Sequence, residues 1–157
     1  MNTTERSQTH ATFVLERDYD ASLDRVWEAF ADEEAKKKWF GAEDDDWKIT
    51  ESVHDFRVGG TDVNTGTFQG AMESRFVGTY TDIVPNERIV YAYDMWINGA
   101  HLSTSVTTIA FEETATGTHL TFTEQGVFLD NNDNPAQREE GTGTLLDALG
   151  ASLAGDS

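Results

Sequence analysis

Residues 75–95 read RFVGTYTDIVPNERIVYAYDM, and this stretch decides the fold. Apolar and polar residues alternate along both arms, which predicts two long strands, and the Pro-Asn-Glu sequence at 85–87 predicts the turn between them. Both faces of the second arm carry apolar residues, because Tyr91 and Tyr93 alternate with Val90 and Ala92. Such strands are covered on both faces or curve around an interior. We therefore expect a curved antiparallel sheet that encloses a core or a cavity.

The remaining elements follow from periodicity. Ser22 is the expected N-cap of a helix, since Leu23, Val26, Trp27 and Phe30 then form one buried stripe. The Gly59-Gly60 and Thr65-Gly66 pairs indicate turns or bulges. Further strands are expected at 11–19, 46–54, 56–63, 67–83, 87–97, 101–113 and 118–128, a short helix at 33–39 and a last helix at 136–153.

The chain of 157 residues fits one domain. We expect residues 1–10, which are polar, to form a flexible tail and residues 11–154 to form the domain. The sequence shows no apolar run long enough for a signal peptide or a membrane span, so the expected location is cytoplasmic, without membrane insertion. There is no cysteine, which excludes disulfides and thiol chemistry.

The chain is strongly acidic. It has 29 aspartates and glutamates against 11 lysines and arginines, a net charge of −18. This charge repels phosphate backbones and anionic lipids, so nucleic acid is not an expected partner. A host adapted to high salt and an ordinary solubilising surface both account for such a charge.

The expected cavity would be lined by aromatic side chains and by leucines of the last helix, with tyrosine hydroxyls to orient a ligand. Ordinary core packing is the alternative role for many of them. The candidate ligand-binding residues are Trp39, Phe40, Phe76, Tyr80, Tyr91, Tyr93, Trp96, Phe122, Leu145, Leu146 and Leu149. Side-chain phase alone leaves open which face of strand 87–97 points inward.

Glu124 is the candidate catalytic residue. It continues the alternation of Leu120 and Phe122, which places its carboxylate among large apolar groups. Burial there would raise its pKa and suit it to general acid-base catalysis. The alternatives are that the strand emerges at the sheet margin, or that Glu124 forms an ion pair with Arg75 or Arg138.

No metal or cofactor site is expected. The four histidines show neither the helical i, i+4 pair nor the clustering of a metal site. The run Glu43-Asp44-Asp45-Asp46 lacks the spaced ligands of a calcium motif. Nucleophile-elbow, phosphate-loop and dinucleotide motifs are also absent from the sequence.

Several segments carry a family resemblance. Together with residues 75–95, they are RDYDASLDRVWEAFAD at 17–32, KKWFG at 37–41, DFRVGG at 55–60 and LTFTEQGVF at 120–128. In this order they resemble the family related to the heat-shock-protein-90 ATPase activator, part of the START-like helix-grip superfamily. The resemblance runs from about His10 to about Leu153. It implies an α+β helix-grip fold, with a curved antiparallel sheet of six to seven strands around a long C-terminal helix and two short helices after the first strand.

The last helix departs from this family. Its members commonly carry a tryptophan after the glycine of the corresponding segment, whereas this chain reads Gly141-Thr142-Gly143. Glycine costs about 1 kcal/mol in a helix interior relative to alanine. Small residues here would let the helix approach the sheet or leave room for a ligand. Alternatively, they would mark the frayed start of the helix.

The resemblance implies three functions that the residues leave open. The first is binding of a small hydrophobic or amphipathic molecule between the last helix and the sheet. The second is a polyketide cyclase-, aromatase- or hydrolase-like enzyme, in which Glu124, helped by Tyr91 or Tyr93, moves protons. The third is a co-chaperone that stimulates a heat-shock-90-type ATPase. Related folds form monomers and dimers, so a homodimer also stays open.

Overall fold

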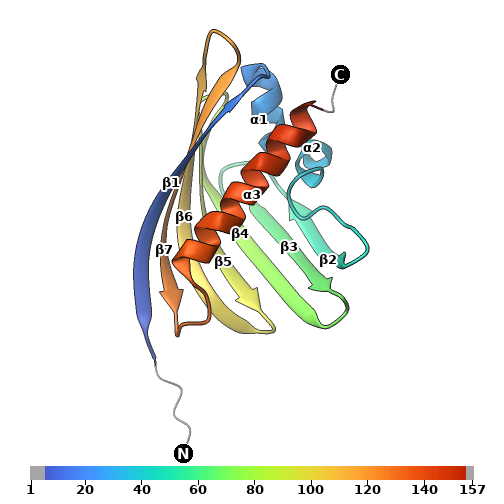
Figure 1. Cartoon of the computed structure of the whole chain (residues 1–157), viewed down its shortest axis with the longest axis vertical. Coiled ribbons are helices and arrows are strands. Elements are labelled where there is room, and N and C mark those ends of the chain that lie inside the picture. Colours follow the sequence, from blue (N-terminus) through green and yellow to red (C-terminus); the bar gives the residue numbers. More distant parts are fainter. Residues whose placement is uncertain (1–5, 155–157) are drawn as a thin grey trace, which may run out of the picture.

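The computed structural model describes residues 6–154, which form one antiparallel sheet and three helices (Figure 1). The strand order is β1-β7-β6-β5-β4-β3-β2. In chain order the elements are β1 (Gln8–Tyr19), α1 (Leu23–Ala31), α2 (Glu33–Lys37), β2 (Trp47–His54), β3 (Thr61–Phe68), β4 (Met72–Val84), β5 (Arg88–Ile97), β6 (Ala100–Glu113), β7 (Thr118–Leu129) and α3 (Pro135–Ala154).

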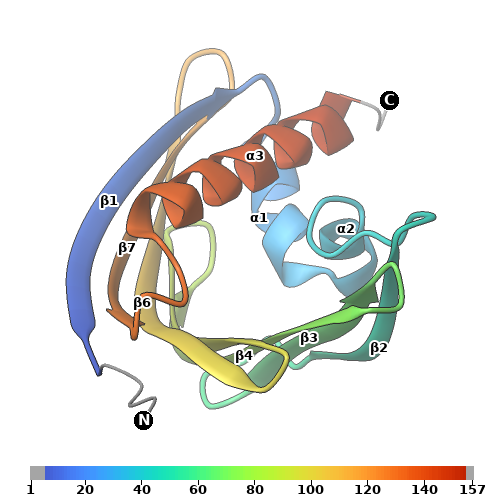
Figure 2. The same ribbon diagram turned by 60° about the horizontal axis from the view of Figure 1, so that its bottom comes forward.

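The long hairpin that decides the fold is confirmed. β4 and β5 pair antiparallel, with Val84 opposite Arg88, and the turn uses Asn86 at a φ of 64°. Asparagine tolerates this left-handed conformation better than most residues, which explains the sharp reversal after Pro85. The sheet is curved, as the apolar residues on both faces of β5 indicated (Figure 2).

The hairpin before it is displaced from its predicted position. β3 spans Thr61–Phe68, and its turn falls at Gln69 and Gly70, which both have positive φ angles. The predicted strands 56–63 and 67–83 were therefore wrong at this turn. Gly66 lies within β3 opposite a register shift in β2, where a Cβ would come within 2.4 Å of the Trp47 ring. The glycine marks a bulge and a close approach, not a chain reversal.

The long helix α3 lies across the concave face of the sheet, and α1 and α2 lie beside its C-terminal half (Figures 1 and 2). Ser22 caps α1 as expected, because its side chain accepts a hydrogen bond from the Arg25 N–H at 3.2 Å. The main core joins α1, α3 and the inner face of the sheet, and it includes Val26, Phe30, Ile109, Leu120 and Leu149. Within residues 6–154, no helix is long and apolar enough to span a membrane.

The first strand is longer than predicted. β1 begins at Gln8, which pairs with Leu129, so residues 8–10 belong to the sheet and the predicted tail of residues 1–10 was wrong there. Ser7 donates its backbone N–H to Asp130 at 2.9 Å, which extends the contact by one residue. The rest of that predicted tail, residues 1–5, lies outside the described residues.

Candidate functional site: a cavity between helix α3 and the sheet

A cavity of about 360 Å³ lies between α3, α2 and the concave face of the sheet. This volume falls within the range of small-molecule sites. Its wall is mainly aromatic, which gives a ligand a large apolar contact area. The aromatic residues of the wall are Phe30, Trp39, Phe40, Phe56, Phe76, Tyr80, Tyr91, Tyr93 and Phe122.

Most residues proposed from the sequence lie in this wall, and two lie elsewhere. Those that line the cavity are Trp39, Phe40, Phe76, Tyr80, Tyr91, Tyr93, Phe122, Leu145 and Leu146. Trp96 is outside it and stacks on His101 with a centroid separation of 4.2 Å. Leu149 packs in the core, one turn of α3 beyond Leu145 and Leu146.

Strand β5 directs its tyrosines inward. The cavity is lined by its odd-numbered residues Ile89, Tyr91, Tyr93 and Met95. The inward face of this strand, which the sequence did not decide, is therefore the face of the odd-numbered residues. Trp96 is out of phase with these residues, which explains why it is absent from the wall. Phe76 on the neighbouring strand stacks on Tyr93 at 4.6 Å, so the aromatic wall continues from β5 to β4.

Glu124 on β7 is 2% exposed and lines the cavity. Tyr93 donates its hydroxyl to Glu124 Oε1 at 2.9 Å, and Thr107 donates to the same oxygen at 3.4 Å. Within residues 6–154, Oε2 has no hydrogen-bond partner, although Arg138 Nη1 lies 3.5 Å from it as an ion pair. Burial raises the pKa of Glu124, and the hydrogen bond from Tyr93 and the Arg138 charge only partly offset this.

Arg138 on α3 holds this end of the cavity together. It donates to the Tyr93 hydroxyl and to Ser103 Oγ at 2.8 Å each, and to Asp133 Oδ2 at 2.5 Å. Of the two arginines considered as partners of Glu124, Arg138 is the one found, because Arg75 pairs with Glu51 instead. The sequence carried a signal for its place in the wall, since Arg138, Thr142 and Leu145 recur at i, i+4 and i+7 of one helix.

The small residues of α3 lie over the cavity and not at a frayed end. Because α3 begins at Pro135, Gly141 and Thr142 fall within the helix, and both line the cavity. Among residues 6–154, a Cβ at Gly141 would meet no atom within 4 Å, so this position opens onto free space. The explanation of a frayed helix start was therefore wrong, and the alternative, that small residues let the helix approach the sheet or leave room for a ligand, stays a prediction.

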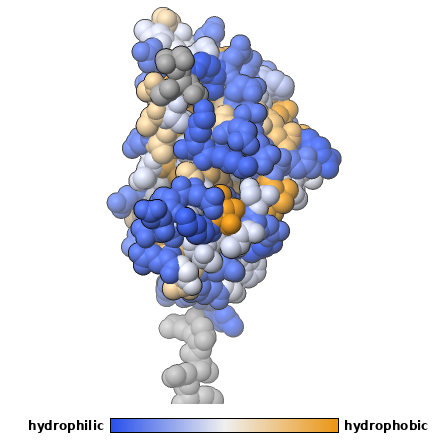
Figure 3. Space-filling view, turned by 90° about the vertical axis from the view of Figure 1, so that its right-hand side faces the viewer, coloured by the Kyte–Doolittle hydropathy of each residue, from blue (hydrophilic) through white to orange (hydrophobic). Residues whose placement is uncertain are grey.

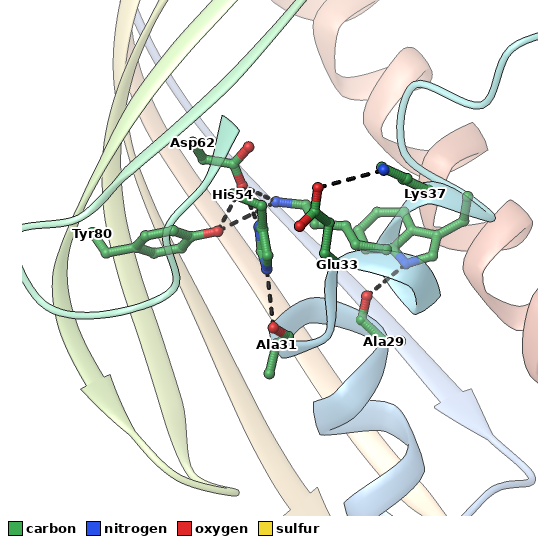
Figure 4. A network of polar contacts seen from close by, with 9 residues as sticks. Ala29, Ala31, Glu33, Lys37, His54, Asp62 and Tyr80 are labelled. Carbon is green, nitrogen blue, oxygen red and sulfur yellow. Dashed lines mark hydrogen bonds and ion pairs between the residues drawn. The ribbon is translucent and has the colours of Figure 1, made fainter. Parts of the chain in front are cut away.

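A second polar network joins α2 to the neighbouring strands (Figure 4). Lys36 of α2 lines the wall and forms an ion pair with Asp62, which also accepts the Tyr80 hydroxyl at 2.7 Å. His54, the last residue of β2, links Asp62 of β3 to the end of α1. Its Nδ1 lies 3.3 Å from Asp62, and its Nε2 lies 3.0 Å from the Ala31 carbonyl. Burial alone would raise the pKa of Asp62, but hydrogen bonds from His54, Lys36 and Tyr80 hold it well below its ordinary value.

Sequence reasoning missed most of this network. Asp62 and Lys36 are 26 residues apart and meet only when α2 folds over β3. Neither residue belongs to a motif, and the displaced β3 hairpin hid the inward position of Asp62. Tyr80 was proposed as a lining residue without its acidic partner.

Comparison with known proteins places this fold in a family. Residues 20–154 match the family model described as "Activator of Hsp90 ATPase homolog 1-like protein". The chain belongs to this family. The comparison with curated proteins gave no match.

Solved structures share the whole fold. An uncharacterised protein from Rhizobium leguminosarum is 40% identical, with a TM-score of 0.91 over 97% of this chain and 99% of that one. A protein from Rhizobium loti is 44% identical, with a TM-score of 0.87 over 94% of this chain and 99% of that one. An AHSA1-like protein from Aeromonas hydrophila is 23% identical, with a TM-score of 0.73 over 92% and 93% of the two chains, and shares the fold. The predicted helix-grip architecture is thereby confirmed.

Proposed function

We propose that the protein binds one small, mostly apolar molecule in the cavity between α3 and the sheet. The observation that carries the proposal is Glu124 Oε2, a buried oxygen in the cavity wall without a hydrogen-bond partner among residues 6–154. Buried polar atoms are paired in nearly all folded proteins, so an exception inside a cavity of ligand size suggests a polar group that arrives with a ligand. The aromatic wall supplies the affinity, and Glu124 supplies the orientation.

The first test compares native and denaturing mass spectra of the gently purified protein, followed by calorimetric titration with decanol. We expect either a bound mass that is lost on denaturation or saturable binding of one decanol. Thr142 is buried against the cavity, so Thr142→Trp should fill it and weaken decanol binding about tenfold or more. Thr144 is exposed on the same helix, and Thr144→Trp is the matched control that should bind normally.

The proposal fails if the protein carries no small molecule and decanol shows no saturable binding. It also fails if Thr144→Trp and Thr142→Trp weaken binding equally while both remain folded, since the cavity would then not be the binding site.

A catalytic function is the second candidate, and the raised pKa of Glu124 beside the Tyr93 hydroxyl favours it. A buried carboxyl group of this kind can exchange a proton with a bound molecule. Once a ligand is known, Glu124→Gln separates the two functions. A binding protein keeps most of its affinity, whereas an enzyme that uses Glu124 as acid or base loses roughly a hundredfold or more of its rate.

The co-chaperone function has less support, because it requires an exposed docking surface. The exposed large hydrophobic residues are spread over β1, β2, β6, the β3–β4 hairpin and the loop before β3: Val14, Val53, Val106, Phe68, Met72 and Val58. The face beside α2 and β2 is mostly hydrophilic, with small separate hydrophobic groups (Figure 3). Stimulation of a heat-shock-90-type ATPase by the purified protein would revive this function.

A further inference from the structure

We infer that the cavity binds an elongated molecule with a hydrogen-bonding group at each end, a donor at Glu124 and an acceptor oxygen at Lys36. This inference rests on the proposed binding function and names the ligand class that fits the same site. It comes from a row of polar side chains across the sheet, of which Glu124, Tyr91 and Tyr80 line the cavity.

The strand register builds this row. Glu124 on β7 is opposite Thr107 on β6, Thr107 is opposite Tyr91 on β5, and Tyr91 is opposite Tyr80 on β4. Residues directly opposite in a sheet share one face, so the four side chains lie side by side across four strands. The neighbouring row on the same face is apolar, because Phe122, Ile109 and Ile89 are also opposite one another. On the other side of the polar row Tyr93 is opposite Ser105, so a ligand on this face would meet apolar groups on the Phe122 side and further polar groups on the Tyr93 side.

At the Glu124 end of the row, one carboxylate oxygen has no hydrogen bond within residues 6–154, although Arg138 Nη1 lies 3.5 Å from it as an ion pair. Tyr93 and Thr107 both donate to Oε1, which leaves Oε2 without a hydrogen bond within the described residues. A ligand hydroxyl could donate to this oxygen. A ligand carboxylate would be repelled there by the buried acid.

The Lys36 end has a donor to spare. An ammonium group carries three N–H donors, and within residues 6–154 Lys36 donates to two oxygens, those of Asp62 and Tyr80. The Lys36 ammonium also lies 4.8 Å from the centroid of the Phe40 ring, and both side chains line the cavity. One N–H therefore remains for an acceptor oxygen of a ligand that lies against the aromatic wall.

The length of the ligand follows from the spacing of the strands. Glu124 and Tyr80 are three strands apart, and steps of about 4.8 Å place their backbones about 14 Å apart along the sheet. A molecule that reaches both ends must be extended. A compact ligand would reach only one.

The experiment titrates the protein calorimetrically with terminal diols from hexanediol to tetradecanediol and with the mono-alcohol of each length. Without a second polar contact, the mono-alcohol should bind more tightly at every length, because the diol must desolvate one more hydroxyl. We expect the reverse at an intermediate length, where the diol should bind about tenfold more tightly than its mono-alcohol, the effect of about one hydrogen bond. The dicarboxylate of that length should bind more weakly than the diol.

Lys36→Met should remove the preference for the diol while mono-alcohols still bind. Lys37→Met is the matched control, because Lys37 carries the same charge on the same helix, pairs with Glu33 and does not line the cavity. If mono-alcohols bind more tightly than diols at every length in the wild type, the two-ended ligand is excluded and the binding function stands. If neither series binds, both proposals are overturned.

Discussion

Asp62 and Glu124 are both buried carboxylates near the same cavity, yet their surroundings shift the two pKa values in opposite directions. Asp62 is 7% exposed and faces Lys36, Tyr80 and His54, which hold its pKa below the ordinary value of 3.8. Glu124 is 2% exposed, and burial raises its pKa above 4.5 despite Tyr93 and Arg138. The number and distance of the donors decide the direction, because both groups lose the solvation of water.

This difference separates a structural role from a functional one. Asp62 Oδ2 contacts Lys36, His54 and Tyr80 and ties α2, which has no buried residue of its own, to β3. Glu124 keeps one oxygen without a hydrogen bond within the described residues and lies in the cavity wall. Burial alone does not distinguish these two roles, because both carboxylates are buried.

The largest effect should come from removing the charge of Asp62. Asp62→Asn leaves Lys36 as an unpaired cation in a largely buried position, which should lower the free energy of unfolding by about 3 kcal/mol. The matched change Glu124→Gln should alter it by no more than about 1 kcal/mol, because it removes a charge that burial disfavours. Urea unfolding measures both. Equal losses in the two variants would remove the distinction between the two acids.

The tyrosines that donate to the two carboxylates provide a second matched pair. Tyr80→Phe removes the 2.7 Å hydrogen bond to Asp62, and Tyr93→Phe removes the 2.9 Å hydrogen bond to Glu124. Each change should cost about 2 kcal/mol of stability, since the acceptor is an ionisable group. Carboxyl carbon NMR should show the pKa of the nearby acid rising in each variant. An unchanged pKa of Glu124 in Tyr93→Phe would mean that this hydroxyl does not set it.

Two glycines of α3 test how closely this helix is packed. Gly141→Ala places a methyl group where no atom of the described residues lies within 4 Å, so it should stabilise the protein by about 1 kcal/mol through helix propensity alone. Gly150→Ala brings its Cβ to 3.1 Å from the Tyr19 ring, so the gain should be smaller or negative. Thermal unfolding compares the two. A destabilised Gly141→Ala would show that the helix is packed more tightly over the cavity than the structure indicates.

The two ends of the cavity also differ in how well the sequence predicts them. Strict alternation in β7 correctly indicated the inward position of Glu124, since a regular strand fixes which face a residue occupies. The same period in β5 was visible, but it left the inward face undecided between Tyr93 and Trp96. Local pattern gives the phase of a strand, whereas only the packed sheet shows which phase faces the core.

The Asp62 end could not be derived in this way. Its contacts join α2 to β3 and depend on the β3–β4 turn, which the sequence placed wrongly because Thr65-Gly66 resembles a turn signal. In the folded chain Gly66 lies opposite the bulge in β2, and the left-handed pair Gln69 and Gly70 makes the reversal. Tertiary contact decided between two glycine-containing segments that local reasoning could not distinguish.

The two acids should also differ in the pH dependence of their contributions to stability. The pKa of Glu124 is higher in the folded protein than its ordinary value of 4.5, so folding strengthens proton binding at this residue. Its contribution to stability is therefore fully present below pH 4.5 and is lost as the pH rises through the higher folded pKa. The free energy of unfolding of the wild type minus that of Glu124→Gln should decline over that interval and then level off.

The pKa of Asp62 is lowered in the folded protein. The free energy of unfolding of the wild type minus that of Asp62→Asn should therefore decline as the pH falls below 3.8. Urea unfolding at a series of pH values checks both signs, with the exposed residue Glu139, as Glu139→Gln, controlling for general loss of charge. If the two differences change in the same direction, the contrast between a carboxylate held as an anion and one kept ready for a proton or a ligand is wrong.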